Sequence, residues 1–153
     1  MQKTFLPISI DITDKKILLV GGGNVAFHKA GILSRFTDKA TVVSPEFQEG
    51  FAGLPFTLSK KRYEPGDLTD VFLVYICTGD ESLNEQIKAD CEKRGILASV
   101  CDNPALCDFV SPAIYKEGTI TIAVASNAEN VRQSIDIRNQ IRTLAENKIL
   151  ITQ

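Results

Sequence analysis

A glycine-rich segment, GGGNVA from Gly21 to Ala26, is the part of this sequence whose residue types and spacing point most directly to chemistry. It fits the pattern GxGxxA. In that pattern Gly21 permits a tight turn, Gly23 lets backbone amides approach a pyrophosphate, and Ala26 allows a helix to pack closely on a strand. A helix that begins here offers N–H groups and a positive dipole end to phosphates. The segment predicts dinucleotide binding, and the alternative is a glycine turn that binds no ligand.

The ribose of such a dinucleotide is usually bound by an acid about 20 residues further on, at the end of the second strand. This chain has Ser44 at that point, and Glu46 follows shortly after it. Glu46 can bind the ribose if the loop after the second strand curls back toward the glycine segment. The alternative is that Glu46 is only a solvated acid of that loop. No arginine is adjacent to Ser44 in the sequence to hold a ribose 2′-phosphate. NAD is therefore expected in preference to NADP.

The elements that must position these residues follow from the alternation of apolar, strand-like runs with helical patterns, which predicts an α/β fold with a parallel sheet. The glycine segment then lies between the first strand and the first helix, as in a Rossmann-like unit. On the first helix, Val25, Ile32, Leu33 and Phe36 are expected to face the sheet. Strands are expected over Lys16–Val20, Lys39–Val43, Phe56–Arg62, Val71–Cys77 and Leu97–Val100, and helices over 24–36 and 81–94, with Gly95 ending the second.

Beyond residue 108 this alternation ends. Residues 109–126 are expected to form two strands around a turn at Lys116–Gly118, and 130–146 an amphipathic helix. The fold class is therefore α/β, a Rossmann-like parallel sheet with a C-terminal hairpin-plus-helix dimerisation segment. The expected domains are residues 1–108, which bind NAD, and residues 109–153, which contribute to dimerisation and the substrate site. Ile149, Leu150 and Ile151 would be exposed on a monomer, as an interface requires.

Composition excludes several other classes. With 17 Lys and Arg against 19 Asp and Glu, the net charge of −2 argues against a nucleic-acid or anionic-membrane partner. No apolar run of about 18 residues is present to span a bilayer, and residues 1–14 do not resemble a signal peptide. The four cysteines form no CxxC pair and His28 is the only histidine, so no metal site is expected. The thiols are expected to be free, in a reducing cytoplasm.

Four segments in order resemble one family, the NAD-dependent precorrin-2 dehydrogenases that also form the N-terminal part of sirohaem synthases. The similar segments are Phe5–Ile8 continuing to Lys16–Ala26 and Lys29, then Thr78–Asn84, then Cys101–Phe109, and lastly Thr121–Ser126. Together they span nearly the whole chain and are far more specific than the glycine segment alone. Unrelated Rossmann proteins have no reason to carry an Asp-x-Pro loop followed by a hairpin and a helix.

The resemblance implies oxidation of precorrin-2 to sirohydrochlorin with NAD as acceptor, on the route to sirohaem or cobalamin. It makes Asp102 the candidate catalytic acid, because a carboxylate beyond the carboxyl end of a parallel strand can take the proton that accompanies hydride transfer. The alternative is that Asp102 only shapes the turn before Pro104. The family holds its cofactor at the positions of Asn24, Val25, Ser44, Pro45, Glu46, Thr78, Gly79 and Asp80.

The resemblance also implies a homodimer and a substrate contact at Ser126, for which the alternative is a helix cap. His28 departs from the family, which usually has arginine or lysine there, and is expected to be a surface or anion-facing residue rather than a catalyst. Lys60–Arg62 is expected to be a solvated face, or else to recognise a polycarboxylate tetrapyrrole. The chain ends at Gln153, whereas relatives continue into a helical segment, so a more open substrate site is expected.

Two other functions stay open at this stage. One is an NAD-binding regulatory module of a transporter or transcriptional regulator, which needs no catalytic acid and is disfavoured by the loop that carries Asp102. The other is insertion of Fe²⁺ or Co²⁺ into the tetrapyrrole product in addition to its oxidation. The sequence does not decide this second activity, because carboxylates that assist chelation need no recognisable spacing.

Overall fold

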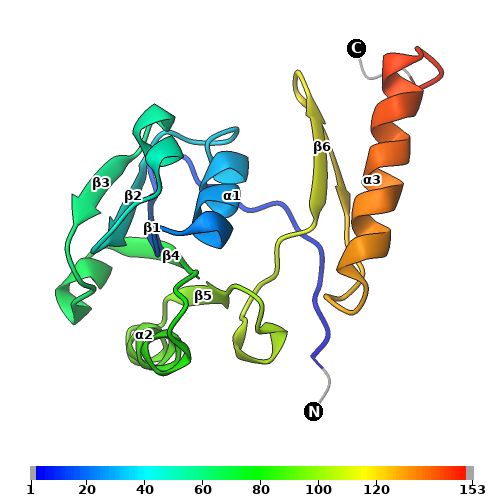
Figure 1. The fold of residues 1–153 in the computed structure, drawn as a ribbon. Helices are drawn as coiled ribbons and strands as arrows, with labels where there is room; N and C mark the ends of the chain where they lie inside the picture. The colour runs from blue at the N-terminus through cyan, green and yellow to red at the C-terminus, as the bar shows by residue number, and fades with distance from the viewer. Residues whose placement is uncertain (1–2, 151–153) are drawn as a thin grey trace. The chain divides into compact units, whose positions relative to one another are not determined.

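The structure, a computed structural model, describes residues 3–150 and separates the chain into two compact units. The larger unit runs from Ser9 to Phe109, and the smaller combines the residues before Ser9 with those after Phe109. The larger unit holds a five-stranded sheet and the smaller a two-stranded one (Figure 1). The candidate dinucleotide site belongs to the larger unit.

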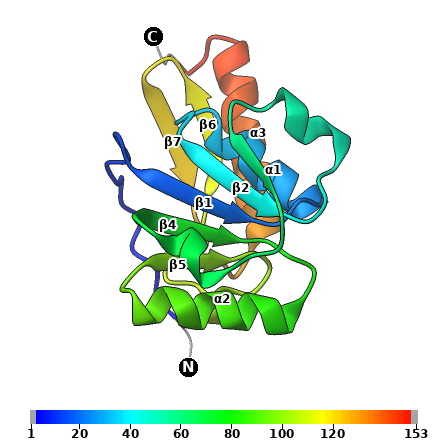
Figure 2. The same ribbon diagram turned by 90° about the vertical axis from the view of Figure 1, so that its left-hand side faces the viewer.

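Five parallel strands form the larger sheet, in the order β3-β2-β1-β4-β5. The chain moves outward from β1 through β2 to β3 and then returns to place β4 on the other side of β1 (Figure 2). This reversal opens a crevice at the carboxyl ends of β1 and β4, where open α/β sheets bind ligands. The predicted strands are confirmed and differ only at their ends: β1 (Lys16–Val20), β2 (Ala40–Ser44), β3 (Thr57–Lys60), β4 (Val71–Ile76) and β5 (Leu97–Val100).

Two helices, α1 (Asn24–Leu33) and α2 (Glu81–Lys93), cover opposite faces of this sheet (Figure 1). Right-handed crossovers explain this, because the step from β1 to β2 and the step from β4 to β5 run in opposite directions along the sheet. The central strand is consequently covered on both sides. Each residue from Ile17 to Val20 is at most 2% exposed, in keeping with the unbroken apolar run of β1.

The buried side of α1 is made mainly of small residues, because the glycine turn brings this helix close to the sheet. Ala26 and Ala30 are fully buried and Leu33 nearly so. The expectation that Val25 and Phe36 face the sheet was wrong, since their side chains are 46% and 39% exposed. The helix ends at Leu33, so Phe36 lies beyond it, and Val25 faces a cavity described below.

Helix α2 has a clear signal at each end. The Asp80 carboxylate accepts a hydrogen bond from the backbone N–H of Leu83, which satisfies a donor of the first turn. Gly95, at φ +66°, ends the helix as predicted, since glycine adopts this left-handed conformation readily. Between them, Ile87 and Cys91 are fully buried.

The smaller unit is the predicted hairpin and helix. Antiparallel strands β6 (Ala113–Glu117) and β7 (Ile120–Val124) are followed by α3 (Val131–Glu146). The Arg138 guanidinium donates to the Ile114 carbonyl at 3.3 Å, which ties α3 to β6. The Asn127 side chain binds the backbone of Lys3 and Phe5, so the N-terminal segment packs with this unit.

Much apolar surface of α3 stays uncovered within the described residues. Val131 is 62% and Ile137 40% exposed. Ile149 is exposed as expected, Leu150 is instead partly buried, and Ile151 lies outside the described residues. The smaller unit therefore presents the apolar surface that an interface needs.

The remaining elements are three 3₁₀ helices in the larger unit, at Glu49–Gly53, Pro65–Leu68 and Pro104–Leu106. Within residues 3–150 no helix is long and apolar enough to cross a bilayer.

Candidate functional site

The glycine turn between β1 and α1 forms the floor of the site. Gly21 has φ +131°, a backbone conformation that other residues rarely adopt, and its N–H donates to the Val43 carbonyl at 3.0 Å. A Cβ on Gly21 would lie 2.3 Å from the Cys77 carbonyl oxygen. This glycine therefore allows β1, β2 and β4 to meet closely at their carboxyl ends.

The next two glycines differ from one another. A Cβ on Gly22 would lie 1.8 Å from the Glu46 carbonyl oxygen, so Gly22 is required by the packing of the protein itself. A Cβ on Gly23 would meet nothing within 4 Å. Gly23 borders open space and caps α1 without a side-chain hydrogen bond. This is the arrangement expected of a helix N-terminus that receives a phosphate.

A cavity of about 920 Å³ opens above this turn, at the carboxyl ends of β1, β2 and β4. It brings together nearly all the residues that the sequence assigned to the cofactor, from three separate loops. It also contains Asp102, the candidate catalytic acid. The predicted residues that line the cavity are Gly21, Gly23, Asn24, Val25, Ser44, Pro45, Thr78, Gly79, Asp80 and Asp102.

Glu46 helps to shape the site through its backbone carbonyl and not through its side chain. The Ser44 hydroxyl donates to the Glu46 carbonyl at 2.7 Å, and the Gln48 N–H donates to the Gly22 carbonyl at 2.8 Å. The loop after β2 therefore does curl back toward the glycine turn, as the interpretation of Glu46 required. The Glu46 side chain is exposed and does not line the cavity.

Arg62 and Tyr63 line the cavity although the sequence did not suggest it. They follow β3, which pairs with β2 so that Ser44 is opposite Lys60. An arginine therefore stands in the same wall as Ser44, although none is adjacent to it in the sequence. The position of Arg62 near Ser44 follows from the pairing of β2 with β3, which the sequence alone does not show.

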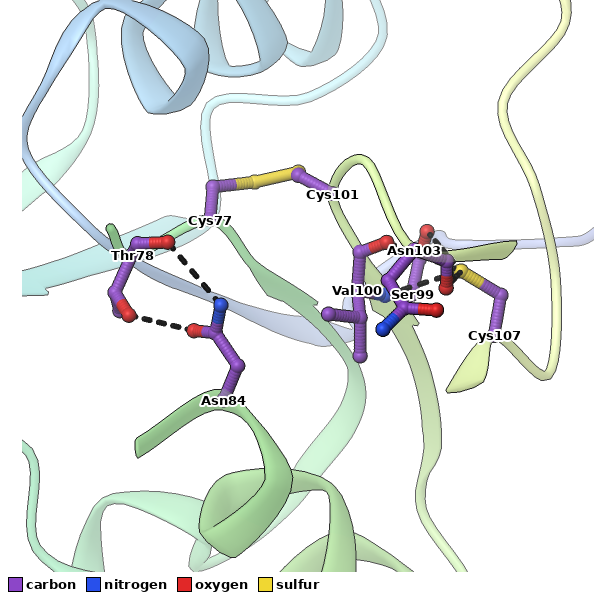
Figure 3. Close-up of a disulfide and its surroundings, with 8 residues drawn as sticks. All are labelled: Cys77, Thr78, Asn84, Ser99, Val100, Cys101, Asn103 and Cys107. Carbon is purple, nitrogen blue, oxygen red and sulfur yellow. Dashed lines mark hydrogen bonds between the residues drawn. A yellow bond between two sulfur atoms is a disulfide. The ribbon is translucent and has the colours of Figure 1, made fainter. Parts of the chain in front are cut away.

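The loop after β4 is held by a side-chain network. The Thr78 hydroxyl donates to the Asn84 side-chain oxygen, and the Asn84 amide donates back to the Thr78 carbonyl at 3.1 Å (Figure 3). The Thr78 hydroxyl also accepts from the Asp80 N–H at 3.2 Å. Asn84 is 7% exposed, so this network fixes the loop from beneath. Thr78 and Asp80 are thus held rigidly at the cavity edge.

Asp102 lies at the turn after β5 with φ +64°, a conformation that aspartate tolerates better than most residues. The turn is closed by a backbone hydrogen bond, from the Asn103 N–H to the Val100 carbonyl at 3.2 Å. Within residues 3–150 no hydrogen bond to the Asp102 carboxylate closes the turn. The side chain is exposed and borders both the large cavity and a smaller one of about 270 Å³.

Cys77 and Cys101 are joined in a disulfide, so the expectation that all four thiols are free was wrong (Figure 3). The cysteines are 24 residues apart and form no short motif, which is why their spacing did not reveal the pair. Parallel pairing of β4 with β5 brings their carboxyl ends together, and the two Cα atoms lie 5.0 Å apart. The bond joins the loop that carries Thr78 to the loop that carries Asp102.

The segment after β5, residues 101–108, is called the Asp102 loop, and its far end is held by Cys107 and Asp108. The Cys107 sulfur accepts from the Val100 N–H and donates to the Val100 carbonyl, both at 3.2 Å. The Asp108 carboxylate accepts from the Lys88 ammonium at 2.8 and 2.9 Å and from the Ala98 N–H at 2.9 Å. Burial by itself lowers the pKa of Lys88, but hydrogen bonds to Asp108 and Glu92 outweigh it and raise the pKa. Asp108 therefore has a structural role.

Lys29 extends from α1 toward the same end of the sheet. Its ammonium lies 5.7 Å from the centre of the Tyr75 ring, which in turn packs edge-on against Phe109. Burial lowers the pKa of Lys29, while Cys107 and Asp102 act in the opposite direction. A partly buried cation thus lies within electrostatic range of the candidate acid.

Two further residues singled out in the sequence, Ser126 and His28, do not line the cavity. Ser126 lies in the smaller unit, where its hydroxyl accepts from the Asn130 N–H at 3.1 Å just before α3. The N-cap of α3 is Asn130, whose side chain accepts from the Gln133 N–H, so Ser126 does not cap the helix. Its predicted substrate contact remains a prediction. His28 is exposed on α1, as expected of a surface residue.

A family model described as putative NAD(P)-binding matches residues 8–113. This range contains the glycine turn, the whole larger sheet and the Asp102 loop. The chain belongs to this family. The expectation of a nicotinamide dinucleotide as cofactor is confirmed by the match.

Curated relatives of this NAD(P)-binding chain include siroheme synthases. The protein from Psychrobacter cryohalolentis is 35% identical over 142 residues, which cover 90% of this chain and 27% of the relative. The protein from Ectopseudomonas mendocina is 35% identical over 141 residues, which cover 91% of this chain and 30% of the relative. The resemblance inferred from the four sequence segments is confirmed. The chain spans less than a third of the length of these relatives.

Among solved structures, SirC, a precorrin-2 dehydrogenase, matches with a TM-score of 0.76 at 20% identity. The match covers 91% of this chain and 70% of SirC. At this identity the likeness concerns the fold.

The residues of this NAD(P)-binding chain fit the group that its family binds. The glycine turn leaves open space at Gly23, the N-terminus of α1 has no side-chain cap, and the cavity is large enough for much of a dinucleotide. N–H groups at the start of α1 would hold the pyrophosphate. The rigid Thr78 loop would border the nicotinamide half.

Proposed function

We propose that this chain oxidises precorrin-2 to sirohydrochlorin with NAD⁺ as the electron acceptor. The proposal is supported by its NAD(P)-binding family, by relatives named siroheme synthase, and by the fold that it shares with a precorrin-2 dehydrogenase. The observation that carries the chemistry is Asp102, an exposed carboxylate in the wall of the dinucleotide cavity. A protein that only sensed a dinucleotide would need no such group.

The reaction removes a hydride and a proton from precorrin-2 and yields NADH and H⁺. When bound, the nicotinamide ring supplies the hydride acceptor. Asp102 takes the proton. Within residues 3–150 the turn that carries Asp102 is closed by a backbone hydrogen bond and not by the Asp102 carboxylate, so the carboxylate is not needed to shape the turn. The partly buried ammonium of Lys29 lies within electrostatic range of Asp102.

The cofactor is held by the residues that the sequence assigned to it. Gly21, Gly23, Asn24 and Val25 border the pyrophosphate, and Thr78, Gly79 and Asp80 border the other half of the dinucleotide. Ser44, Pro45 and the backbone of Glu46 border the adenosine end. The Glu46 carboxylate is exposed outside the cavity lining and favours NAD⁺ through long-range repulsion of a 2′-phosphate. Arg62 in the same wall acts against this preference.

The working form is a homodimer in the cytoplasm, joined through the hairpin and α3, with Ser126 as a substrate contact. The exposed apolar residues of α3 support the dimer, since a surface of this kind usually marks an interface.

The deciding experiment is anaerobic incubation of the purified chain with precorrin-2 and NAD⁺, followed by absorbance of the tetrapyrrole and of NADH. We expect both products in equal amounts, and neither when NAD⁺ is omitted. Tight NAD⁺ binding without oxidation of precorrin-2 would overturn the proposal in favour of a regulatory module.

A further inference from the structure

The Cys77–Cys101 disulfide is set directly in the dinucleotide site. Both cysteines line the large cavity, and Cys101 also lines the smaller one. Each follows the last residue of its strand and is held in the sheet by its backbone, because the Cys77 N–H donates to Val20 and the Cys101 N–H donates to Ile76, both at 2.8 Å. The bond therefore closes the gap between the ends of β4 and β5 at the point where the cavity lies (Figure 3).

The neighbours of this bond are the residues on which the site depends. The Cys77 carbonyl packs against Gly21 in the glycine turn, and Thr78 follows Cys77 in the chain. Asp102 follows Cys101. A movement of either cysteine therefore displaces its neighbour in the chain, which is Thr78 of the cofactor loop for Cys77 and the candidate acid Asp102 for Cys101.

The Asp102 loop has two anchors of different strength. Hydrogen bonds of Cys107 and the ion pair of Asp108 with Lys88 hold its far end. At its near end the disulfide is the covalent anchor. Opening the disulfide leaves the far end in place and removes the covalent restraint from the end that carries Asp102, where backbone hydrogen bonds remain.

The other two cysteines are unsuited to the same chemistry. Cys91 is fully buried in α2, and burial raises the pKa of its thiol to about 11. Cys107 is 3% exposed and hydrogen bonded to the backbone of the loop. Cys101 is the more exposed member of the disulfide and borders both cavities, which makes it the member of the pair better placed for attack by a small thiol.

We propose that Cys77 and Cys101 form a reversible redox pair that controls the dinucleotide site, with the disulfide form binding NAD⁺ more tightly than the dithiol form. Disulfides in a reducing compartment are usually transient and either catalytic or redox-sensing. The compartment and the role of Asp102 rest on the function proposed above, whereas the pair and its effect on NAD⁺ do not.

The switching step needs a dithiol reductant. One thiolate of the reductant attacks the Cys101 sulfur, the bond to Cys77 breaks, and Cys77 leaves as a thiol after taking a proton. The second thiol of the reductant then displaces Cys101 from the mixed disulfide. Two electrons and two protons pass to the protein, which ends with two thiols, while the reductant ends as a disulfide. A disulfide oxidant reverses the exchange.

The first experiment follows the bond and the cofactor affinity together. The purified chain is equilibrated in mixtures of reduced and oxidised dithiothreitol, free thiols are trapped by alkylation, and the Cys77–Cys101 peptide is measured by mass spectrometry. NAD⁺ affinity is measured on the same samples by calorimetry. We expect affinity to fall about 3- to 10-fold as the bond opens, which is the cost of ordering about one released side chain on binding. Equal affinity in both states, or no bond in the oxidised sample, would overturn the proposal.

Two variants locate the effect. Cys77→Ser with Cys101→Ser should bind NAD⁺ like the reduced wild type and should not respond to dithiothreitol. Cys91→Ser is the matched control, because it removes a buried thiol outside the pair and should respond as the wild type does. A thermal melt of each variant shows that it is folded. A response that persists in the double variant would refute the pair as its source.

These readouts need no precorrin-2. A chain that fails to oxidise precorrin-2 and yet changes its NAD⁺ affinity with redox state refutes the proposed function and supports the pair. The opposite result refutes the pair alone.

Discussion

The Lys88 ammonium donates to both carboxylate oxygens of Asp108, at 2.8 and 2.9 Å, and the side chain of Lys88 is only 7% exposed. This ion pair joins α2 to the end of the Asp102 loop. Asp108 lies within one of the segments that resemble the family, and this ion pair gives it a structural role.

Asp108→Ala should lower the free energy of unfolding by about 2 to 3 kcal/mol, because it leaves a buried charge without its main partner. Glu92→Gln is the control. It removes the other, largely exposed partner of Lys88 and should cost less than about 1 kcal/mol. Urea denaturation measures both, and equal effects would show that Asp108 is no more important than a surface acid.

Gly23→Val should abolish NAD⁺ binding and leave the fold intact. The new side chain enters open space that the pyrophosphate needs, and Gly23 has an extended backbone, φ −87°, that valine adopts. Gly22→Ala is the contrasting variant, because its Cβ would strike the Glu46 carbonyl and destabilise the protein. Calorimetry and thermal melts separate the two effects. Undiminished affinity in a folded Gly23→Val variant would show that this glycine does not face the cofactor.

Asp102→Asn should lower the rate of precorrin-2 oxidation by about 10²- to 10⁴-fold and leave NAD⁺ affinity nearly unchanged. Asparagine also tolerates the left-handed conformation at this position, so the turn should keep its shape. What the amide loses is the ability to accept a proton at neutral pH. Steady-state kinetics beside a thermal melt tests this, and wild-type turnover in a stable variant would remove Asp102 from the mechanism.

NAD⁺ should bind more tightly than NADP⁺, because the exposed Glu46 carboxylate repels a 2′-phosphate at long range and Arg62 in the cavity wall offsets this repulsion only in part. Arg62→Ala should therefore widen the preference for NAD⁺, and Glu46→Gln should narrow it. Calorimetry of both cofactors with the wild type and the two variants measures the balance. Tighter NADP⁺ binding by the wild type would contradict the prediction.

Light scattering should report a dimer at micromolar concentration. Val131→Asp with Ile137→Asp should yield a folded monomer, since both substitutions put charge on the exposed apolar side of α3. Leu58→Asp is the matched control: it changes an exposed apolar residue of the larger unit and should leave the dimer intact. A monomeric wild type would be evidence against the interface.

The sequence alone determined the main helices and strands and marked the candidate phosphate site. A run such as Lys16–Val20 indicates a buried parallel strand, and the glycines after it follow a short spacing pattern that can be read without the structure. Their close contacts with Cys77 and Glu46 are visible only in the structure. Asp80 and Gly95 mark the ends of α2 for the same reason, because capping depends on neighbours in the chain. The resemblance of four segments then pointed to Asp102.

The tertiary structure decided what depends on strand order and on side-chain packing. Arg62 reaches the wall that contains Ser44 only because β3 pairs with β2, and Cys77 meets Cys101 only because β5 pairs with β4. Neither relationship leaves a spacing in the sequence, since residues from different strands meet through hydrogen bonds across the sheet. The exposure of Val25 was mispredicted because helical periodicity gives a face without saying whether sheet or cavity lies opposite it.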